Sequence, residues 1–176
     1  MNQKTNNYII PKIYAYTGTH GTGKSTAAYK LAHQLKITNP GKEVGLLMEV
    51  ARQCPLPILA KGQTPTEEAQ RWIFGKQLSV EIEMATKFDI VVADRTVVDT
   101  IAYTTALGFI DLANAMLGFI HQHMGVFKEI RMLKAADRPL VDDGLRHMDE
   151  GIRMEVERHL SLIYKMLGIT VIMGEP

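Results

Sequence analysis

The sequence predicts an α/β domain in which parallel strands form one sheet with helices on both faces. Short apolar runs alternate with longer amphipathic segments along the chain, which is typical of repeated strand–helix units. The run 89–94 (DIVVAD) is almost wholly apolar, as expected for a strand that is covered on both faces. A glycine-rich segment at 18–25 separates an apolar run from an amphipathic one, which indicates a strand–loop–helix unit.

The same periodicities give the expected bounds of each element. The second helix has the clearest beginning, with Thr64 as its N-cap, Pro65 as its first helical residue and Glu67 as the glutamate of a capping box. The helical pattern is interrupted near Gly108, which separates two later helices. We expect helices over 24–36, about 65–86, 96–107, 111–123 and 149–167, and strands over 9–17, 44–48, 89–94, 126–133 and 169–173.

The bulk composition describes one ordinary domain. The chain has 176 residues, a hydrophobic fraction of 46% and a net charge of +1, so we expect 1–176 to fold around a single core. It has no stretch of about 18 consecutive apolar residues and no apolar run near its N-terminus, so we expect neither a membrane span nor a secretory signal. The lone Cys54 fits a reducing compartment, and we expect a cytoplasmic protein. The near-neutral charge argues against a large nucleic-acid interface.

The segment 18–25 carries the most specific motif, because it fits G-x-x-x-x-G-K-[ST] at every fixed position. In such a phosphate-binding loop (P-loop), backbone N–H groups surround phosphate oxygens, the lysine reaches the β- and γ-phosphates, and the serine hydroxyl binds magnesium. We therefore expect ATP and Mg²⁺ as cofactors, with Lys24 catalytic, Ser25 a metal ligand and Thr26 adding a hydroxyl near the α-phosphate. The expected nucleotide-binding residues are Gly18, Thr19, His20, Gly21, Thr22, Gly23, Lys24, Ser25 and Thr26.

A carboxylate and an arginine follow the buried strand at 89–94. Asp94 ends this strand, where its carboxylate would reach magnesium directly or through water. Arg95 comes next and could pair with the transferring phosphoryl group or with the acceptor. Thr96 and Asp99 have the spacing of a capping box, so we interpret Asp99 as structural. Asp94 is an expected metal ligand and, with Arg95, an expected catalytic residue.

A glutamate and an arginine follow the strand at 44–48. Glu49 would face the same crevice as Asp94, because the carboxyl ends of parallel strands meet at one edge of the sheet. Its carboxylate could take the proton of an acceptor hydroxyl as a general base. Arg52 could bind an acceptor phosphate or hold Glu49 ionised. The alternative for this pair is a surface ion pair at i, i+3 spacing.

Four segments follow one another over nearly the whole chain: GTHGTGKS, LLMEVAR, VVADRT and a charged DDGLR run. This order resembles the P-loop nucleoside and nucleotide kinases, and among them the ribosylnicotinamide-kinase-like, AAA-type ATP-binding group. The resemblance implies a three-layer fold with a five-stranded parallel sheet in the order 2-3-1-4-5 and a mobile lid. It also implies that Glu49 is the acceptor-side base and that Asp94 and Arg95 form the acid–arginine pair. Thymidylate kinases usually have an arginine where this chain has Met48, and deoxynucleoside kinases have a proline where it has Val50.

The charged segment at about 134–148 is the candidate lid. Kinases close such a segment over the phosphates, which excludes water and brings arginines to the developing charge. Arg138 and Arg146 have the required charge, and Gly144 allows movement. Arg146 is the expected catalytic arginine because it lies in the DDGLR run. The alternative is an ordinary polar loop that precedes a helix.

One aromatic residue is a candidate for contact with the acceptor. Trp72 lies on a helix that would border the acceptor crevice, with Gln70 and Gln77 near it. Its ring could stack on a base, and packing in the core is the alternative role.

These residues predict an ATP-dependent kinase that phosphorylates a hydroxyl of a small nucleoside-like acceptor, such as a nucleoside or ribosylnicotinamide. A nucleoside monophosphate kinase is the alternative that Arg52 and Arg95 would suit. An acceptor-independent ATPase and a polynucleotide 5′-end kinase are further alternatives, the latter requiring a basic groove. A GTPase is not expected, because the sequence lacks the base-reading N-K-x-D motif. The expected partner is a small molecule, and the sequence leaves open whether the chain forms a homodimer.

Overall fold

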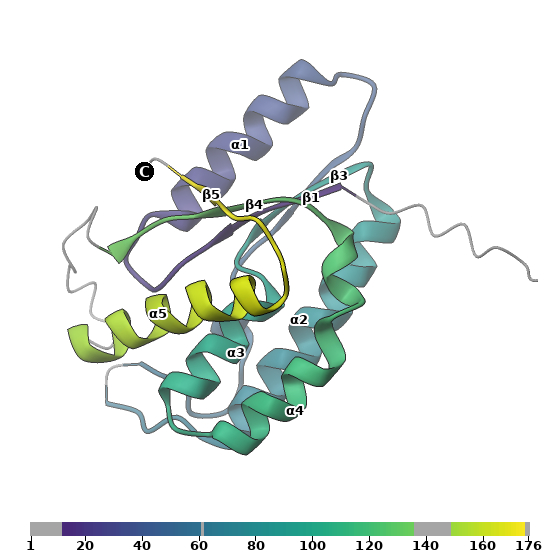
Figure 1. Cartoon of the computed structure of the whole chain (residues 1–176). Coiled ribbons are helices and arrows are strands. Elements are labelled where there is room, and N and C mark those ends of the chain that lie inside the picture. Colours follow the sequence, from purple (N-terminus) through teal and green to yellow (C-terminus); the bar gives the residue numbers. More distant parts are fainter. Residues whose placement is uncertain (1–11, 61, 136–148, 175–176) are drawn as a thin grey trace, which may run out of the picture.

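Five parallel strands form one open sheet with helices on both of its faces (Figure 1). This computed structural model describes residues 12–60, 62–135 and 149–174. The strands are β1 (Lys12–Thr17), β2 (Val44–Leu47), β3 (Ile90–Asp94), β4 (Phe127–Met132) and β5 (Ile172–Met173). The helices are α1 (Lys24–Thr38), α2 (Glu67–Lys87), α3 (Val97–Ala106), α4 (Ile110–Ile120) and α5 (Glu150–Met166), with short 3-10 helices η1 (Val50–Gln53) and η2 (His123–Val126). The strand order is β2-β3-β1-β4-β5, which confirms the α/β fold class and the order that the resemblance implies.

The two faces of the sheet belong to separate hydrophobic cores, because side chains alternate along each strand. Every residue of β3 is buried. Val91 and Ala93 belong to the larger core, which also contains the inward faces of α3, α4 and α5. Val92 belongs to the smaller core, together with Ala28 of α1. Cover on both faces explains why the sequence of this strand is an unbroken apolar run.

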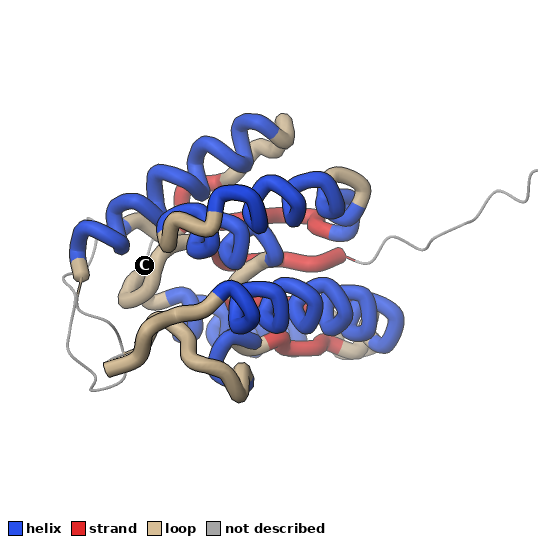
Figure 2. Tube along the Cα trace, turned by 90° about the horizontal axis from the view of Figure 1, so that it is seen from below, coloured by secondary structure: helices blue, strands red, loops and turns tan. Residues whose placement is uncertain are grey.

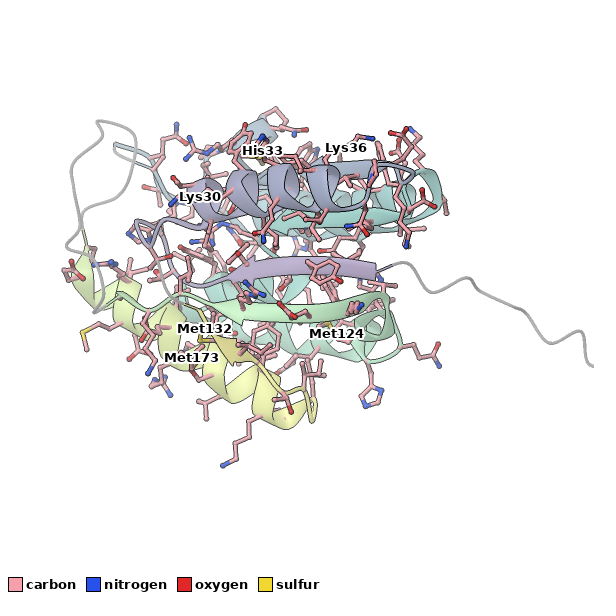
Figure 3. All side chains as sticks on the ribbon, turned by 90° about the horizontal axis from the view of Figure 1, so that it is seen from above. Lys30, His33, Lys36, Met124, Met132 and Met173 are labelled. Atoms are coloured by element: carbon pink, nitrogen blue, oxygen red, sulfur yellow. The ribbon has the colours of Figure 1, made fainter. Side chains whose placement is uncertain are left out.

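Helix α1 covers one face of the sheet. It packs against β1, β2 and β3, with Leu31 and Leu35 directed at the smaller core. Lys30, His33 and Lys36 lie along its exposed side, as Figure 3 shows. This division into an apolar and a charged side is the expected one for a helix between a sheet and solvent.

The other helices cover the opposite face, so that helices lie in front of the strands when the molecule is seen from below (Figure 2). Helix α3 is the central one, since it packs against α2, α4 and α5. Its first six residues, 97–102, are all buried, including the polar Asp99 and Thr100. Because α3 begins directly after β3, it places these polar groups at the carboxyl edge of the sheet. Within the described residues, no helix combines the length and the apolar character needed to cross a membrane.

Helix α2 begins two residues later than the sequence predicts. Its N-cap is Thr66, whose hydroxyl accepts the backbone N–H of Ala69 at 3.2 Å. The prediction of Thr64 as N-cap, with Glu67 in a capping box, is therefore wrong. Thr66 offers the same hydroxyl and is followed directly by Glu67 and Glu68, whose negative charges are favourable in the first turn of a helix.

Two predicted elements near the C-terminus are shorter than expected. The helix predicted over 111–123 ends at Ile120, and η2 follows it because the chain turns there, with Met124 buried, to enter β4. The strand predicted over 169–173 has two residues. Gly168, with φ 67°, ends α5, and the three residues after it bring the chain back to the edge of the sheet.

Candidate active site

The phosphate loop connects the end of β1 to the start of α1. Gly18, Gly21 and Gly23 have φ angles of 138°, 75° and 86°, a region that favours glycine. A Cβ atom on Gly18 would also lie 2.4 Å from the carbonyl oxygen of Leu133, the residue directly after β4. Both the backbone angle and the close approach therefore require glycine at position 18. The result is a tight turn that leads directly into a helix N-terminus, which fits a phosphate group.

Lys24 is buried inside this loop. Its Nζ donates hydrogen bonds to the carbonyl oxygen of Thr19 at 2.5 Å and to Thr22 Oγ1 at 3.2 Å. Burial, together with the positive charge of Arg95, lowers the pKa of Lys24 to about 7. The ammonium group of Lys24 is thus removed from water and bonded to oxygens of the loop itself. Phosphate oxygens of a bound nucleotide would replace these oxygens as its partners.

Ser25, in the first turn of α1, contacts Asp94, the last residue of β3. Asp94 pairs with Tyr16 in the parallel register of β3 and β1, so it lies beside the beginning of the loop. Ser25 Oγ donates a hydrogen bond to Asp94 Oδ2 at 2.6 Å. A hydroxyl and a carboxylate are the protein oxygens that magnesium uses in P-loop enzymes. No cluster of three or more His, Cys, Asp or Glu occurs in the part of the chain that the structure describes, so a magnesium ion here would complete its shell with water and phosphate oxygens.

Arg95 joins the loop to the end of β2. Its backbone has a φ of 90°, which is unusual for a residue other than glycine and is typical of functional sites. The guanidinium donates to Glu49 Oε1 at 2.7 Å and to the carbonyl oxygen of Gly18 at 3.1 Å. It also lies 5.1 Å from the centre of the Tyr103 ring. These contacts fix a buried positive charge between the phosphate loop and Glu49.

Glu49 lies between two arginines, one buried and one exposed. Its Oε1 accepts from Arg95, and its Oε2 accepts from Arg52 Nε at 2.9 Å. The side chain of Glu49 is 16% exposed, whereas that of Arg52 is 51% exposed. Burial alone would raise the pKa of Glu49, but the charges of Arg95 and Lys24 and the hydrogen bond from Arg52 outweigh it and lower the pKa to about 2. Glu49 is therefore a carboxylate throughout the physiological pH range.

Asp99 has a wider role than the sequence predicts. The capping box with Thr96 is confirmed, since Asp99 Oδ2 accepts the Thr96 N–H at 2.8 Å. Oδ2 also accepts from Thr17 Oγ1 at 2.9 Å. The other oxygen, Oδ1, accepts from the Gly18 N–H at 3.3 Å and from Arg95 Nη1 at 3.3 Å. One buried carboxylate thus ties the start of α3 to the start of the phosphate loop.

Replacement of Asp99 by alanine is expected to destabilise the protein by about 3 kcal/mol. The change removes the carboxylate that accepts hydrogen bonds from the Thr17 hydroxyl and the Gly18 N–H. It also removes a negative charge beside the buried guanidinium of Arg95. Urea unfolding followed by circular dichroism measures the loss. Asp111→Ala, which removes an exposed aspartate from the first turn of α4, is the matched control and should cost less than about 1 kcal/mol. Equal losses for the two variants would show that the contacts of Asp99 do not stabilise the fold.

The tip of the phosphate loop is held by two residues that the sequence did not indicate. The hydroxyl of Tyr103 accepts the backbone N–H of His20 at 2.9 Å and lies 3.1 Å from His20 Nδ1. Arg153, buried on α5, donates from Nε to the carbonyl oxygen of His20 at 3.2 Å. These contacts join residues 83 and 133 positions apart, so no local sequence signal could have revealed them.

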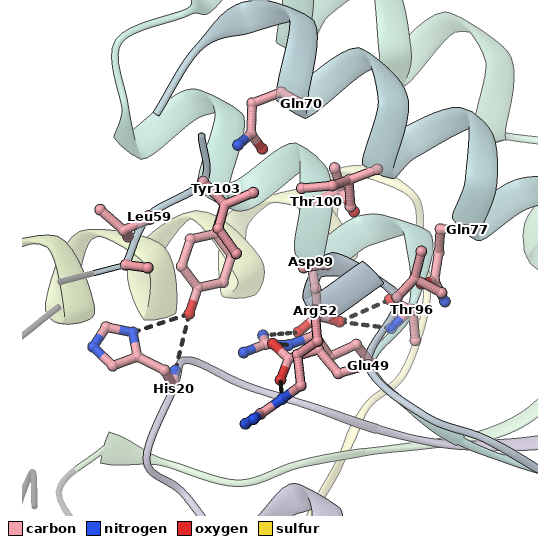
Figure 4. Close-up of a pocket in the computed structure, with 16 residues that line it drawn as sticks. His20, Glu49, Arg52, Leu59, Gln70, Gln77, Thr96, Asp99, Thr100 and Tyr103 are labelled. Carbon is pink, nitrogen blue, oxygen red and sulfur yellow. Dashed lines mark hydrogen bonds and ion pairs between the residues drawn. The ribbon is translucent and has the colours of Figure 1, made fainter. Parts of the chain in front are cut away.

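A pocket of about 390 Å³ opens beside the loop at this edge of the sheet (Figure 4). Its walls come from the loop, from the end of β2 with η1, and from the facing sides of α2 and α3. The figure shows the ring of Tyr103 and the Glu49–Arg52 pair at its borders. The polar and aromatic residues that line it are His20, Glu49, Arg52, Gln70, Gln77, Arg95, Thr96, Asp99, Thr100 and Tyr103.

The remaining predicted residues lie away from this pocket or outside the described residues. Trp72 does not line the pocket and packs against the larger hydrophobic core, the alternative role that its sequence position allowed. Thr26 is exposed on α1. Arg138 and Arg146, with most of the candidate lid, fall within 136–148, outside the described residues.

Comparison with protein families gives a match over nearly the whole chain. A family model described as an AAA domain matches residues 13–174. A comparison with curated proteins gives no match. Several solved structures share the fold at identities below 25%, so their likeness concerns the fold alone.

Three of the similar structures are nucleoside and nucleotide kinases. Thymidylate kinase from Ehrlichia chaffeensis is 17% identical with a TM-score of 0.62, covering 93% of this chain and 89% of that one. Deoxyadenosine kinase from M. mycoides with bound dATP is 14% identical with a TM-score of 0.63, covering 93% and 90% of the two chains. Thymidylate kinase from Candida albicans is 16% identical with a TM-score of 0.63, covering 92% and 83%. Because the family model spans far more than half of its length, the chain belongs to this family of AAA domains, and it has the fold of the P-loop nucleoside and nucleotide kinases.

Proposed function

We propose that this protein is an ATP- and Mg²⁺-dependent phosphotransferase that acts on a hydroxyl of a small nucleoside-like acceptor. The observation that carries the proposal is the pocket of about 390 Å³ directly beside the phosphate loop, with Glu49 and Arg95 in its wall. A pocket of this volume suits a small ligand. A mechanical ATPase would have no need of a second ligand pocket next to its phosphates. The fold that the chain shares with thymidylate and deoxyadenosine kinases supports the same function.

The loop side of the site would bind and neutralise the phosphates. Lys24 would exchange its hydrogen bonds to Thr19 and Thr22 for phosphate oxygens, which costs little reorganisation because its ammonium already lies inside the loop. Ser25 and Asp94 would hold the magnesium ion, which supplies charge neutralisation at the β- and γ-phosphates. Positioning and charge neutralisation supply most of the rate in phosphoryl transfer, so these residues would supply most of the catalysis.

On the acceptor side, Glu49 would orient the attacking hydroxyl. Its carboxylate lines the pocket and would accept the hydroxyl hydrogen in a hydrogen bond. A pKa of about 2 makes Glu49 a weak base in the ligand-free protein. The loose transition state of phosphoryl transfer tolerates this, because the hydroxyl needs to lose its proton only late in the reaction. The guanidinium of Arg95 lies between Glu49 and the Gly18 carbonyl. It would stabilise the negative charge on the phosphoryl group as this group passes from ATP to the acceptor.

A nucleoside monophosphate kinase is the second candidate function. Arg52 and Arg95 both line the pocket, and two guanidinium groups would suit an acceptor that already carries a phosphate. In that case Glu49 would position the two arginines and would not contact a hydroxyl.

The test is the release of ADP from Mg-ATP in the presence of different acceptors. The panel comprises nucleosides, nucleoside monophosphates, nicotinamide riboside and a 5′-hydroxyl oligonucleotide. We expect stimulation by a small molecule with a free hydroxyl. Stimulation by monophosphates alone would favour the second candidate. Hydrolysis that no acceptor increases would contradict both kinase functions and indicate an acceptor-independent ATPase.

Nucleotide binding is expected to take up a proton at alkaline pH. Lys24 has its pKa lowered from 10.5 to about 7, so above pH 7 the ligand-free protein increasingly lacks this proton. Phosphate oxygens favour the charged form, so binding raises the pKa and the proton returns. Calorimetric titration with ADP in buffers of different ionisation enthalpy should show an uptake approaching one proton at pH 8.5 and none at pH 5.5. An uptake that does not depend on pH across this range would show that Lys24 does not titrate near neutrality.

A further inference from the structure

A fully buried carboxyl group lies behind the wall of the pocket and outside the machinery described above. Glu81, on α2, is 0% exposed. Its Oε2 lies 2.5 Å from His123 Nε2, and the His123 side chain is 9% exposed. Its Oε1 accepts the backbone N–H of Val97, the first residue of α3, at 3.0 Å. Both oxygens are therefore held in place by elements distant in the sequence.

The same oxygen, Oε1, also accepts a hydrogen bond from Gln77 Nε2 at 2.8 Å. Burial raises the pKa of Glu81, and the hydrogen bonds from His123 and Gln77 act in the opposite direction. The orientation of the Gln77 amide is the same whether the Glu81 carboxyl group is ionised or protonated. Because Oε1 accepts the Val97 N–H, a proton on the carboxyl would lie on Oε2, toward His123. Oε1 thus needs a donor from Gln77, which places the amide nitrogen at Glu81 and the amide oxygen on the opposite side.

Gln77 is one of the residues that line the pocket, and it is 2% exposed. Its amide oxygen accepts no hydrogen bond from any residue that the structure describes. An amide oxygen at the wall of a ligand pocket is stabilised when the ligand supplies an N–H or O–H group, and loses its hydrogen bond to water when the ligand supplies none. The preference of the pocket at this point therefore depends on which end of the Gln77 amide faces inward.

We propose that Glu81 is a positioning residue that holds the Gln77 amide with its oxygen toward the pocket, and that the acceptor is selected for a hydrogen-bond donor at this place. The second half of the proposal rests on the proposed function, because it concerns the molecule that the pocket binds. The chemical class is a nucleoside-like acceptor with an exocyclic N–H group, such as an amino-substituted base or a carboxamide. His123 acts through Glu81, by fixing the Oε2 side of its carboxyl.

The orientation of the amide is tested without any substrate. In a ¹⁵N-labelled protein, the side-chain NH₂ signal of Gln77 is assigned as the one that disappears in Gln77→Leu. At least one of its protons should exchange slowly with solvent, because Glu81 binds it. The protection should persist in Glu81→Gln, whose amide oxygen can take the place of Oε1, and should be lost in Glu81→Met. Rapid exchange in the wild-type protein would overturn the positioning role, whatever the protein catalyses.

The selection is tested with pairs of ligands that differ by one donor group: adenosine against purine riboside, cytidine against its analogue without the 4-amino group, and nicotinamide riboside against its 3-acetylpyridine analogue, in which an uncharged methyl group replaces the NH₂. For the best acceptor, loss of the donor should lower kcat/KM by about 10-fold or more, mainly through KM. The ratio of kcat/KM between the two ligands of a pair should fall toward one in Gln77→Leu and Glu81→Met. It should keep its wild-type value in Glu81→Gln. Glu83→Gln, which changes an exposed glutamate on the same helix, is the control and should keep the wild-type ratio.

Binding of the same pairs, measured by calorimetry, separates this inference from the proposed function. Preferential binding of the donor-bearing ligand without any phosphoryl transfer would overturn the proposed function and leave the inference standing. Phosphoryl transfer with no preference within any pair, or with a preference that Gln77→Leu does not change, would overturn the inference alone. Absence of binding to every ligand would overturn the proposed function and the selection of the acceptor, while the exchange measurement alone would still decide the positioning of the Gln77 amide. Because Glu81→Met leaves the Val97 N–H without its acceptor, the Gln77→Leu result decides the outcome if that variant fails to fold.

Discussion

Replacement of Lys24 by alanine is expected to lower turnover by about 10³-fold or more while leaving the fold intact. The ammonium of Lys24 is the buried positive charge that lies inside the phosphate loop, between the Thr19 carbonyl and the Thr22 hydroxyl. Its removal would take a preorganised charge away from the place where negative charge develops during transfer. Steady-state ADP release with the best acceptor of the panel measures this loss.

Stability provides the independent readout for the same variant. Burial and Arg95 lower the pKa of Lys24 to about 7, which means that the folded protein disfavours the charged form. The alanine variant should therefore unfold at a temperature equal to or above that of the wild type, as measured by calorimetry at pH 6, where the lysine is charged. Lys30→Ala, on the exposed side of the same helix, is the control and should keep full activity. Substantial residual turnover in Lys24→Ala would contradict the phosphate-loop mechanism.

Replacement of Glu49 by glutamine is expected to lower kcat by about 10²-fold or more, because the amide cannot accept the proton of the hydroxyl. The amide retains the shape of the side chain and one oxygen for the hydrogen bond from Arg95. It removes the negative charge opposite a buried guanidinium, so the folded fraction must be measured with the rate. Single-turnover kinetics with saturating acceptor separate the loss in the chemical step from weaker binding.

Glu43→Gln is the matched control for Glu49→Gln. Glu43 is exposed and lies just before β2, whereas Glu49 lies just after it, so the two residues flank the same strand at opposite edges of the sheet. The control should keep the wild-type rate. A wild-type rate in Glu49→Gln itself would assign Glu49 the structural task of holding Arg95 and Arg52. That outcome would favour the monophosphate acceptor, whose phosphate does not need a base.

The acceptor and phosphate sides of the site depend on one another through Arg95. Its side chain contacts Glu49 in the pocket wall and the Gly18 carbonyl in the loop, and its strained backbone is held by the hydrogen bond from its N–H to the Tyr16 carbonyl at 2.8 Å. The positive charge of Arg95 also lowers the pKa of both Lys24 and Glu49. Substitutions on either side are therefore expected to be non-additive with substitutions at Arg95.

The sequence by itself determined the features that depend on neighbouring residues. The alternation of apolar and amphipathic segments identified the α/β class, since these periods are set by the geometry of strands and helices. The phosphate loop was evident because its glycines and its Lys24-Ser25 end are consecutive. The capping box of Thr96 and Asp99 was evident because its partners are three residues apart. The closeness of Glu49 and Arg95 followed from a general rule, that parallel strands end at one edge of the sheet.

Only the tertiary structure decided the features that join distant segments. It showed that Trp72 packs against the larger core, that Asp99 also binds Thr17 and Gly18, and that α5 and α3 hold the tip of the loop. It also brought both His123 and Gln77 into contact with the carboxyl group of Glu81. Such contacts depend on which helix faces lie together once the sheet has formed. Residues that are 42 or 133 positions apart show no local pattern in a single sequence that would indicate a hydrogen bond between them. Each partner, taken alone, is an ordinary polar residue.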